Sequence, residues 1–90
     1  MNVSVSIPTA LRRHTEGRDR FACVASSVSD LLDQLSARFP ELSPHLRDER
    51  GKLRRFLNIY INDEDARFLG ADYEFKEGDE VTLVPSIAGG

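Results

Sequence analysis

One segment of this chain has the pattern of a long amphipathic helix, and its apolar stripe constrains the fold more than any other feature. Ser27 is a favourable N-cap residue, Asp30 follows three positions later as in a capping box, and Pro40 ends the helical pattern. The stripe repeats at helical spacing and consists of Val28, Leu31, Leu32, Leu35 and Phe39. A helix with one apolar face cannot bury that face alone, so the rest of the chain must provide a sheet face that covers it.

The remaining segments predict short strands, because apolar and polar residues alternate in them. The predicted strands cover residues 2–7, 20–25, 56–61, 66–69 and 80–84. Turn-forming residues separate the last three strands at positions 62–65 and 77–79. Residues 9–19 predict a polar loop, and residues 43–46 predict a short helical turn. Pro85 is expected to end the last strand.

The order of these elements predicts an α+β fold, a mixed sheet packed around one main helix. This arrangement is the ubiquitin-like β-grasp, with the first and last strands side by side in parallel. Phe21 and Cys23 are expected to face inward. In the strand 56–61 we expect Leu57, Ile59 and Ile61 to face the helix, and Phe56, Asn58 and Tyr60 to face away from it. The domain is expected to span residues 1–85, and a flexible tail residues 86–90.

Composition narrows the classes of function. The chain has 90 residues, 40% of them hydrophobic, and a formal net charge of −3. This charge argues against a nucleic-acid binder, and no apolar run is long enough to predict a membrane span. Cys23 is the single cysteine, so we expect no disulfide framework and a cytoplasmic location. With His14 and His45 it forms no metal-binding signature, and no catalytic constellation is defined, so the chain is predicted not to be an enzyme.

The chain ends in Gly89-Gly90. Glycine has no Cβ, so two glycines can extend through a channel too narrow for other residues. The α-carboxylate of Gly90 is a poor electrophile by itself. Attack of that carboxylate on the α-phosphate of ATP would convert it into a reactive acyl-adenylate. The alternative is an accidental tail on an interaction module.

Three segments of the chain resemble the ubiquitin-like sulfur carriers of the MoaD/ThiS class, most closely the CysO branch. They are NVSVSIPTALRRHT, GKLRRFLNIYINDEDARF and EVTLVPSIAGG. The resemblance implies that an E1-like adenylyltransferase adenylates Gly90 and that a sulfur donor, often a rhodanese persulfide, then replaces AMP. The resulting C-terminal thiocarboxylate is the sulfur donor, and Ile87, Ala88 and Gly89 form the tail that carries it. ATP is used by the partner, and the chain itself needs no cofactor or metal.

The resemblance also implies a second partner, a biosynthetic enzyme that accepts the sulfur. In the CysO branch this enzyme is similar to a pyridoxal-phosphate sulfhydrylase, and a zinc peptidase frees the product. Neither nucleic acid nor a membrane is expected as a partner. Two alternatives stay open: a ubiquitin-like modifier that forms isopeptides with lysines, and the small subunit of a molybdopterin synthase. The final sulfur acceptor, whether cysteine, a thiosugar, a thiazole or molybdopterin, also stays open.

Partner docking is the remaining functional expectation. Phe56 and Tyr60 are expected on the open face of the sheet, where aromatic anchors would favour an interface. Charges are unevenly distributed, with a local +3 in residues 47–55 and a local −4 in residues 71–90. Such uneven charge is typical of a solvated surface. The alternative is docking through electrostatic complementarity, in which the acidic stretch with Glu80 leads into the tail.

Overall fold

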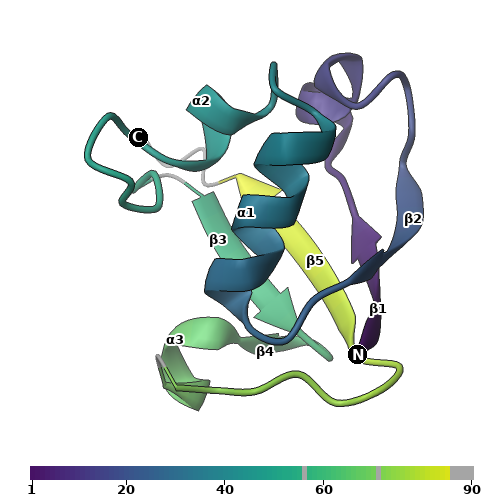
Figure 1. Cartoon of the computed structure of the whole chain (residues 1–90), viewed down its shortest axis with the longest axis vertical. Helices are drawn as coiled ribbons and strands as arrows, with labels where there is room; N and C mark the ends of the chain where they lie inside the picture. The colour runs from purple at the N-terminus through teal and green to yellow at the C-terminus, as the bar shows by residue number, and fades with distance from the viewer. Residues whose placement is uncertain (56, 71, 86–90) are drawn as a thin grey trace.

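The computed structural model describes residues 1–55, 57–70 and 72–85, and Figure 1 shows how the elements are arranged. In chain order the elements are β1 (Asn2–Ser6), the 3₁₀ helix η1 (Thr9–His14), β2 (Arg20–Val24), α1 (Val28–Arg38), α2 (Ser43–Leu46), β3 (Leu57–Ile61), β4 (Glu64–Asp65), α3 (Ala66–Leu69) and β5 (Glu80–Pro85). In the described residues no helix is long and apolar enough to cross a membrane.

The strands form one five-stranded sheet in the order β2-β1-β5-β3-β4. β1 pairs antiparallel with β2 and parallel with β5, and β3 pairs antiparallel with β5 and β4. The helix α1 crosses one face of the sheet (Figure 1). This topology confirms the predicted β-grasp fold, including the parallel pair formed by the first and last strands. β5 is therefore the central strand, held by hydrogen bonds on both sides.

The N-terminus of α1 forms as its sequence predicts. The Ser27 Oγ accepts a hydrogen bond from the Asp30 backbone N–H at 3.1 Å. The Asp30 carboxylate accepts from the backbone N–H and the hydroxyl of Ser26, at 2.9 and 3.2 Å. The reciprocal contact of a capping box is thus made one residue earlier than expected. These bonds lower the pKa of Asp30, the backbone N–H of Ser26 being the main cause.

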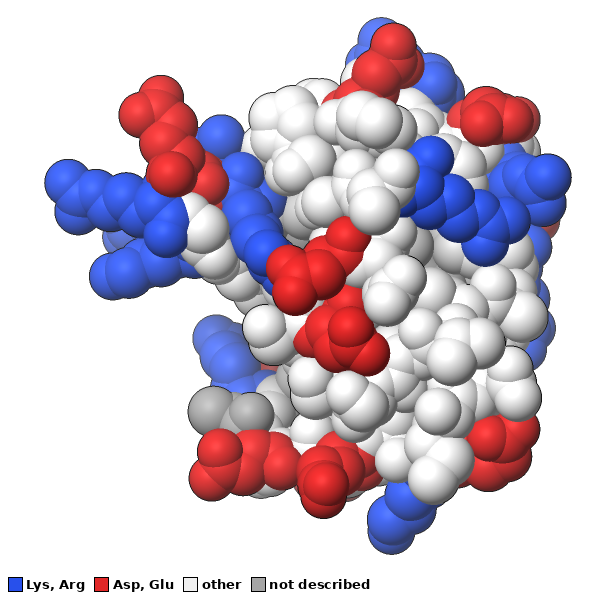
Figure 2. Space-filling view, in the orientation of Figure 1, with Lys and Arg blue, Asp and Glu red and all other residues white. Residues whose placement is uncertain are grey.

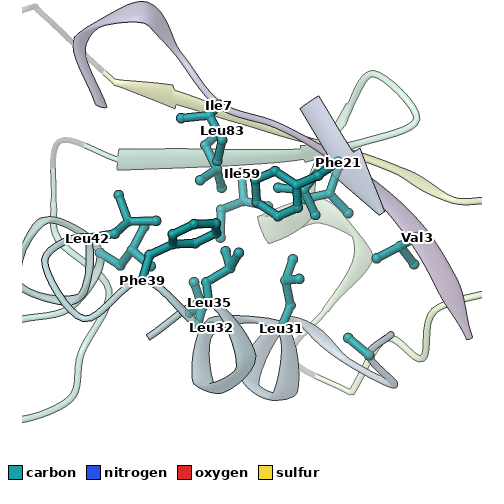
Figure 3. Packing of buried hydrophobic residues seen from close by; sticks show 14 of the residues in the cluster. Val3, Ile7, Phe21, Leu31, Leu32, Leu35, Phe39, Leu42, Ile59 and Leu83 are labelled. Carbon is teal, nitrogen blue, oxygen red and sulfur yellow. The ribbon is translucent and has the colours of Figure 1, made fainter. Parts of the chain in front are cut away.

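The core lies between α1 and the sheet (Figure 3). Four residues of the predicted helix stripe are buried there, Leu31, Leu32, Leu35 and Phe39, and Val28 is partly buried against them. The odd-numbered residues of β3 face the same core, whereas Asn58 and Tyr60 are only half-buried, on the other face. Phe21 is buried as predicted, and Cys23 is half-buried against the core. The inward faces of the predicted strands are confirmed.

The prediction of a return strand over residues 66–69 is wrong, because these residues form the short helix α3. A two-residue turn reverses the chain after β3, with Asn62 and Asp63 at φ of 53° and 70°. The returning strand β4 is only two residues long, because the Asp65 side chain accepts from the Arg67 backbone N–H at 2.9 Å and caps a helix. Local capping therefore outweighs the strand pairing expected for these residues.

Two further boundaries differ from the predictions. The expected loop at residues 9–19 contains the helix η1, which follows Pro8 at its N-cap. The last strand does not stop before Pro85, which pairs with Leu57. Proline is tolerated at the end of a strand because only one ladder donor is lost there. Phe56, the predicted first residue of its strand, lies outside the described residues.

Candidate functional site

The predicted reactive tail, Ile87, Ala88, Gly89 and Gly90, lies outside the described residues, and so does the expectation that it is flexible. The structure instead shows the position of Pro85, the residue that precedes this tail. Pro85 ends the central strand β5 opposite Leu57, the first residue of β3. The last described residue is therefore fixed to the body of the sheet, and any tail function starts from a rigid base.

The acidic stretch that precedes β5 lies away from Pro85. Glu80 is the first residue of β5 and Pro85 the last, so about 17 Å separates them at roughly 3.3 Å per residue. The sequence places the acidic residues just before the tail, but the strand between them carries the chain to the opposite end of the sheet. Acidic residues 72–80 therefore do not flank the point at which the tail begins.

Basic residues flank that point instead. β1 runs parallel to β5, so η1, which follows β1, lies at the same end of the sheet as Pro85. The chain from residue 47 to residue 55 also ends there, immediately before β3. Figure 2 shows this segment as a projection rich in Lys and Arg side chains. We call residues 47–55 the basic loop.

The basic loop is braced by side-chain hydrogen bonds. The Asp48 carboxylate accepts from the backbone N–H groups of Arg50 and Lys52 at 2.9 and 3.0 Å. These bonds, the one from Lys52 first, lower the pKa of Asp48. The Arg54 Nε donates to the Pro44 carbonyl at 2.9 Å, and Arg47 donates to the Asp33 carboxylate at 2.7 Å. The Arg47 and Arg54 side chains are half-buried because they donate these hydrogen bonds to the body of the domain. The exposed cations of the basic loop are Arg50, Lys52 and Arg55.

The structure brings two of the predicted docking residues to the same face. Tyr60 lies opposite Thr82 in the β3–β5 ladder, and Glu80 lies two residues from Thr82 on the same strand face. Glu80 forms an ion pair with Arg20 at 3.5 Å, in which both side chains are more than half exposed, so its contribution to stability is small. The docking role of Tyr60, Glu80 and Phe56 stays a prediction, and Phe56 lies outside the described residues.

Asp79, a buried carboxylate immediately before β5, is not among the residues predicted from the sequence. It accepts hydrogen bonds from the Tyr73 hydroxyl at 2.7 Å, the Asn62 Nδ2 at 2.9 Å and the Lys76 backbone N–H at 2.9 Å. Burial opposes the charged form, yet these bonds together hold the pKa of Asp79 below its usual value. The network joins the β3–β4 turn to the chain before β5. A single Asp in a turn-like sequence gave no signal for it.

The described residues contain no group of three or more His, Cys, Asp or Glu side chains able to hold a metal. Burial raises the pKa of the Cys23 thiol, which disfavours the nucleophilic thiolate. His14 and His45 stack with ring centroids 4.2 Å apart. This contact joins η1 to α2 next to the basic end of the sheet.

The mixed sheet and the helix across it together define a ubiquitin-like β-grasp protein. The chain belongs to the ThiS family, whose family model matches residues 5–90. The resemblance to this class and the predicted fold are thus confirmed.

Individual relatives agree with this assignment. The sulfur carrier protein CysO of Mycobacterium tuberculosis is 44% identical over 93 aligned residues, which cover the full length of both chains. A chain in the crystal structure of the Amycolatopsis orientalis BexX/CysO complex is 43% identical, with a TM-score of 0.84 and coverage of 98% of this chain and 99% of that one. Small archaeal modifier protein 1 of Methanosarcina acetivorans is 28% identical, with a TM-score of 0.84 over 99% of this chain and 96% of that one. The predicted class, a carrier protein rather than a catalyst, agrees with the name of the CysO relative.

Proposed function

We propose that this chain carries sulfur as a thiocarboxylate on Gly90. The observation that supports the proposal most strongly is the full-length similarity to a sulfur carrier protein, which includes the Gly-Gly end. The fold supports it as well, because the central strand β5 provides a rigid base from which a tail can reach into the active site of another protein.

In the proposed reaction an E1-like adenylyltransferase binds the chain and ATP. The carboxylate of Gly90 attacks the α-phosphate, pyrophosphate leaves, and the acyl-adenylate forms. The terminal sulfur of a donor persulfide, such as that of a rhodanese, then displaces AMP and forms an acyl disulfide. A thiol cleaves the S–S bond of this acyl disulfide, which leaves the thiocarboxylate on Gly90 and a disulfide between the thiol and the donor. The chain contributes the carboxylate and its recognition surface and holds no cofactor of its own. The cytoplasmic location predicted from the single cysteine belongs to this proposal.

We infer that a second enzyme accepts the sulfur for biosynthesis. The similarity to CysO favours cysteine as the product, formed by a pyridoxal-phosphate sulfhydrylase and released by a zinc peptidase. The complex of a CysO with BexX, in which the carrier chain is 43% identical to this one, supports docking of the folded domain onto a partner protein. A thiosugar, a thiazole or molybdopterin as the product would require another acceptor but the same carrier chemistry.

Intact-mass spectrometry tests this proposal. The chain is incubated with an E1-like enzyme, ATP and a sulfur donor, and each component is omitted in turn. We expect a mass increase equal to the exchange of one oxygen for sulfur, located at Gly90 and dependent on all three. Absence of that product under conditions in which the enzyme forms the adenylate would contradict the proposal.

Protein modification is the second candidate function. It is favoured by the similarity to small archaeal modifier protein 1, which covers 99% of this chain. The two functions share the adenylated C-terminus and differ in what attacks it. If the products in the same assay are adducts on lysines of other proteins, and no thiocarboxylate forms, the modifier function replaces the carrier function.

A further inference from the structure

One edge of the sheet is only partly paired in the described residues. β4 pairs with Tyr60 and Ile61 alone, so Leu57, Asn58 and Ile59 have a strand partner only on the β5 side. The Asn62 N–H donates to the Glu80 carbonyl of the chain beside it, at 2.8 Å. Because antiparallel ladder groups alternate, the odd-numbered residues of β3 direct their backbone N–H and C=O groups away from β5. Ile59 thus presents a donor and an acceptor to the open edge.

A groove runs along this same edge. It has a volume of about 330 Å³ and is lined by Leu57 and Ile59 of β3, Val28 of α1, Ala66 of α3 and Leu53 of the basic loop. These residues make the groove mainly apolar. An unpaired strand edge beside an apolar groove matches the way in which proteins bind extended peptides: the backbone forms a new ladder, and alternate side chains enter the groove.

Charge indicates the chemistry of the peptide. Leu53 lines the groove and also a second hollow formed by the basic loop, so the two adjoin at Leu53. The charged residues that line the second hollow are four cations, Arg50, Lys52, Arg54 and Arg55, and two carboxylates, Asp48 and Glu49, so cations predominate there. Figure 2 shows the basic projection next to a recess in the surface. Asp65 lies in the groove wall, but the Arg67 guanidinium binds it at 2.7 Å, which balances its charge.

We propose that an extended acidic segment of a partner protein binds as an added strand along Leu57–Ile59, with an apolar side chain in the groove and its carboxylates on the basic loop. The inference rests on the proposed function in one respect: it assigns the segment to the activating enzyme. Leu57 pairs with Pro85, so the bound strand would lie two strand spacings, about 10 Å, from the strand that leads to the tail.

Two synthetic peptides provide the probe: acetyl-Val-Thr-Ile-Thr-Asp-Glu-Glu-amide and the peptide of reversed sequence, one for each strand direction. Binding is followed by NMR of the full chain and by exchange of the Ile59 amide. We expect one of them to bind with a Kd of about 1 mM or tighter and to protect that amide at least tenfold. The opposite sheet edge, β2, serves as the internal control and should not change.

Matched controls test each part of the proposal. Replacing the three acidic residues of the peptide with lysine should abolish binding, and N-methylation at alternate residues should prevent strand pairing. Leu53→Glu should weaken binding at least tenfold. Phe68→Glu makes the same change at an 80% exposed residue of α3 outside the groove, and it should leave binding within twofold.

The proposal is overturned if neither peptide binds at about 5 mM, or if the shifts lie away from Leu57–Ile59. A dimer of the chain that Leu53→Glu dissociates, detected by sedimentation, would assign the edge to a second copy instead. Peptide binding needs neither ATP nor Gly90. The two proposals therefore fail separately: loss of thiocarboxylate formation contradicts the carrier function, whereas normal kinetics of Leu53→Glu with the activating enzyme contradict the docking site.

Discussion

At the scale of single residues, Asp79 is a buried carboxylate that accepts three hydrogen bonds. We predict that Asp79→Ala lowers the free energy of unfolding by about 3 kcal/mol, because three donors lose a charged acceptor in a buried setting. Urea unfolding followed by circular dichroism measures the change. Tyr73→Phe removes one of the three bonds and should cost about 1 kcal/mol. An Asp79→Ala variant as stable as the parent would refute the structural role of the network.

The same carboxylate predicts a pH dependence. Its pKa is lowered in the folded state, so the unfolded chain binds the proton more readily. The stability that Asp79 provides is complete well above its usual pKa, about 3.8, and is lost as the pH falls through the lower folded pKa. We expect Asp79→Asn to show a shallower fall in stability between about pH 5 and pH 2 than the parent chain. If the stability of the parent and of Asp79→Asn falls equally steeply in acid, Asp79 is not the source of the pH dependence.

Gly90 is the residue on which the proposed chemistry depends. We predict that deleting Gly90, or replacing Gly89 with phenylalanine, abolishes thiocarboxylate formation and leaves the far-ultraviolet circular dichroism unchanged. The reason is that both residues follow the last strand, which ends at Pro85. Intact mass after the complete reaction is the measurement. Sulfur transfer by the Gly90 deletion would exclude this carrier mechanism.

At the scale of elements, α1 offers two serines on which the same substitution should have opposite effects. Ser27→Ala removes the N-cap acceptor and should destabilise the fold by about 1 kcal/mol. Ser36→Ala removes a buried hydroxyl for which the described residues offer no hydrogen-bond partner, and it raises helix propensity. We expect it to be neutral or stabilising by about 0.5 kcal/mol. Thermal unfolding of both variants decides whether capping governs this helix.

The elements that could be predicted from sequence are those whose side-chain pattern has a clear period. α1, β1, β3 and β5 were predicted because a buried face imposes a repeat of 3.6 or 2 residues. α3 was not, since four residues carry no readable period and the Asp65 cap decides their conformation. Of the site, Gly90 was predicted from the terminal Gly-Gly together with the family resemblance, and it lies outside the described residues. The basic surroundings of Pro85 could not be predicted, because they depend on which segments far apart in sequence share one end of the sheet.

At the scale of the whole molecule, charge differs between the two ends of the sheet. Basic side chains gather near Pro85, and acidic ones gather near Glu80. Partner surfaces that approach Pro85 therefore meet positive potential, which favours an acidic partner and a fast association. The separation of about 17 Å along β5 exceeds the Debye length of about 8 Å at physiological salt, so each end acts independently.

This polarity predicts a difference between two variants that change the net charge equally. Lys52→Glu, in the basic loop, should slow association with the activating enzyme by about five-fold and weaken its salt dependence. Lys76→Glu, near the acidic end, should change the rate by less than about two-fold. Stopped-flow mixing at two salt concentrations measures both rates. Equal effects would mean that only net charge matters and that the basic loop has no special place in docking.

The parallel pairing of β1 with β5 also determines how the molecule can be handled. The Asn2 backbone N–H donates to the Glu77 side chain at 2.9 Å, so the amino terminus lies at the end of the sheet remote from Pro85 (Figure 1). An affinity tag or a bead attached at the amino terminus would leave Pro85 and the open strand edge facing the solution. Immobilised in that way, the chain can be used to capture the activating and sulfur-accepting enzymes proposed to bind it.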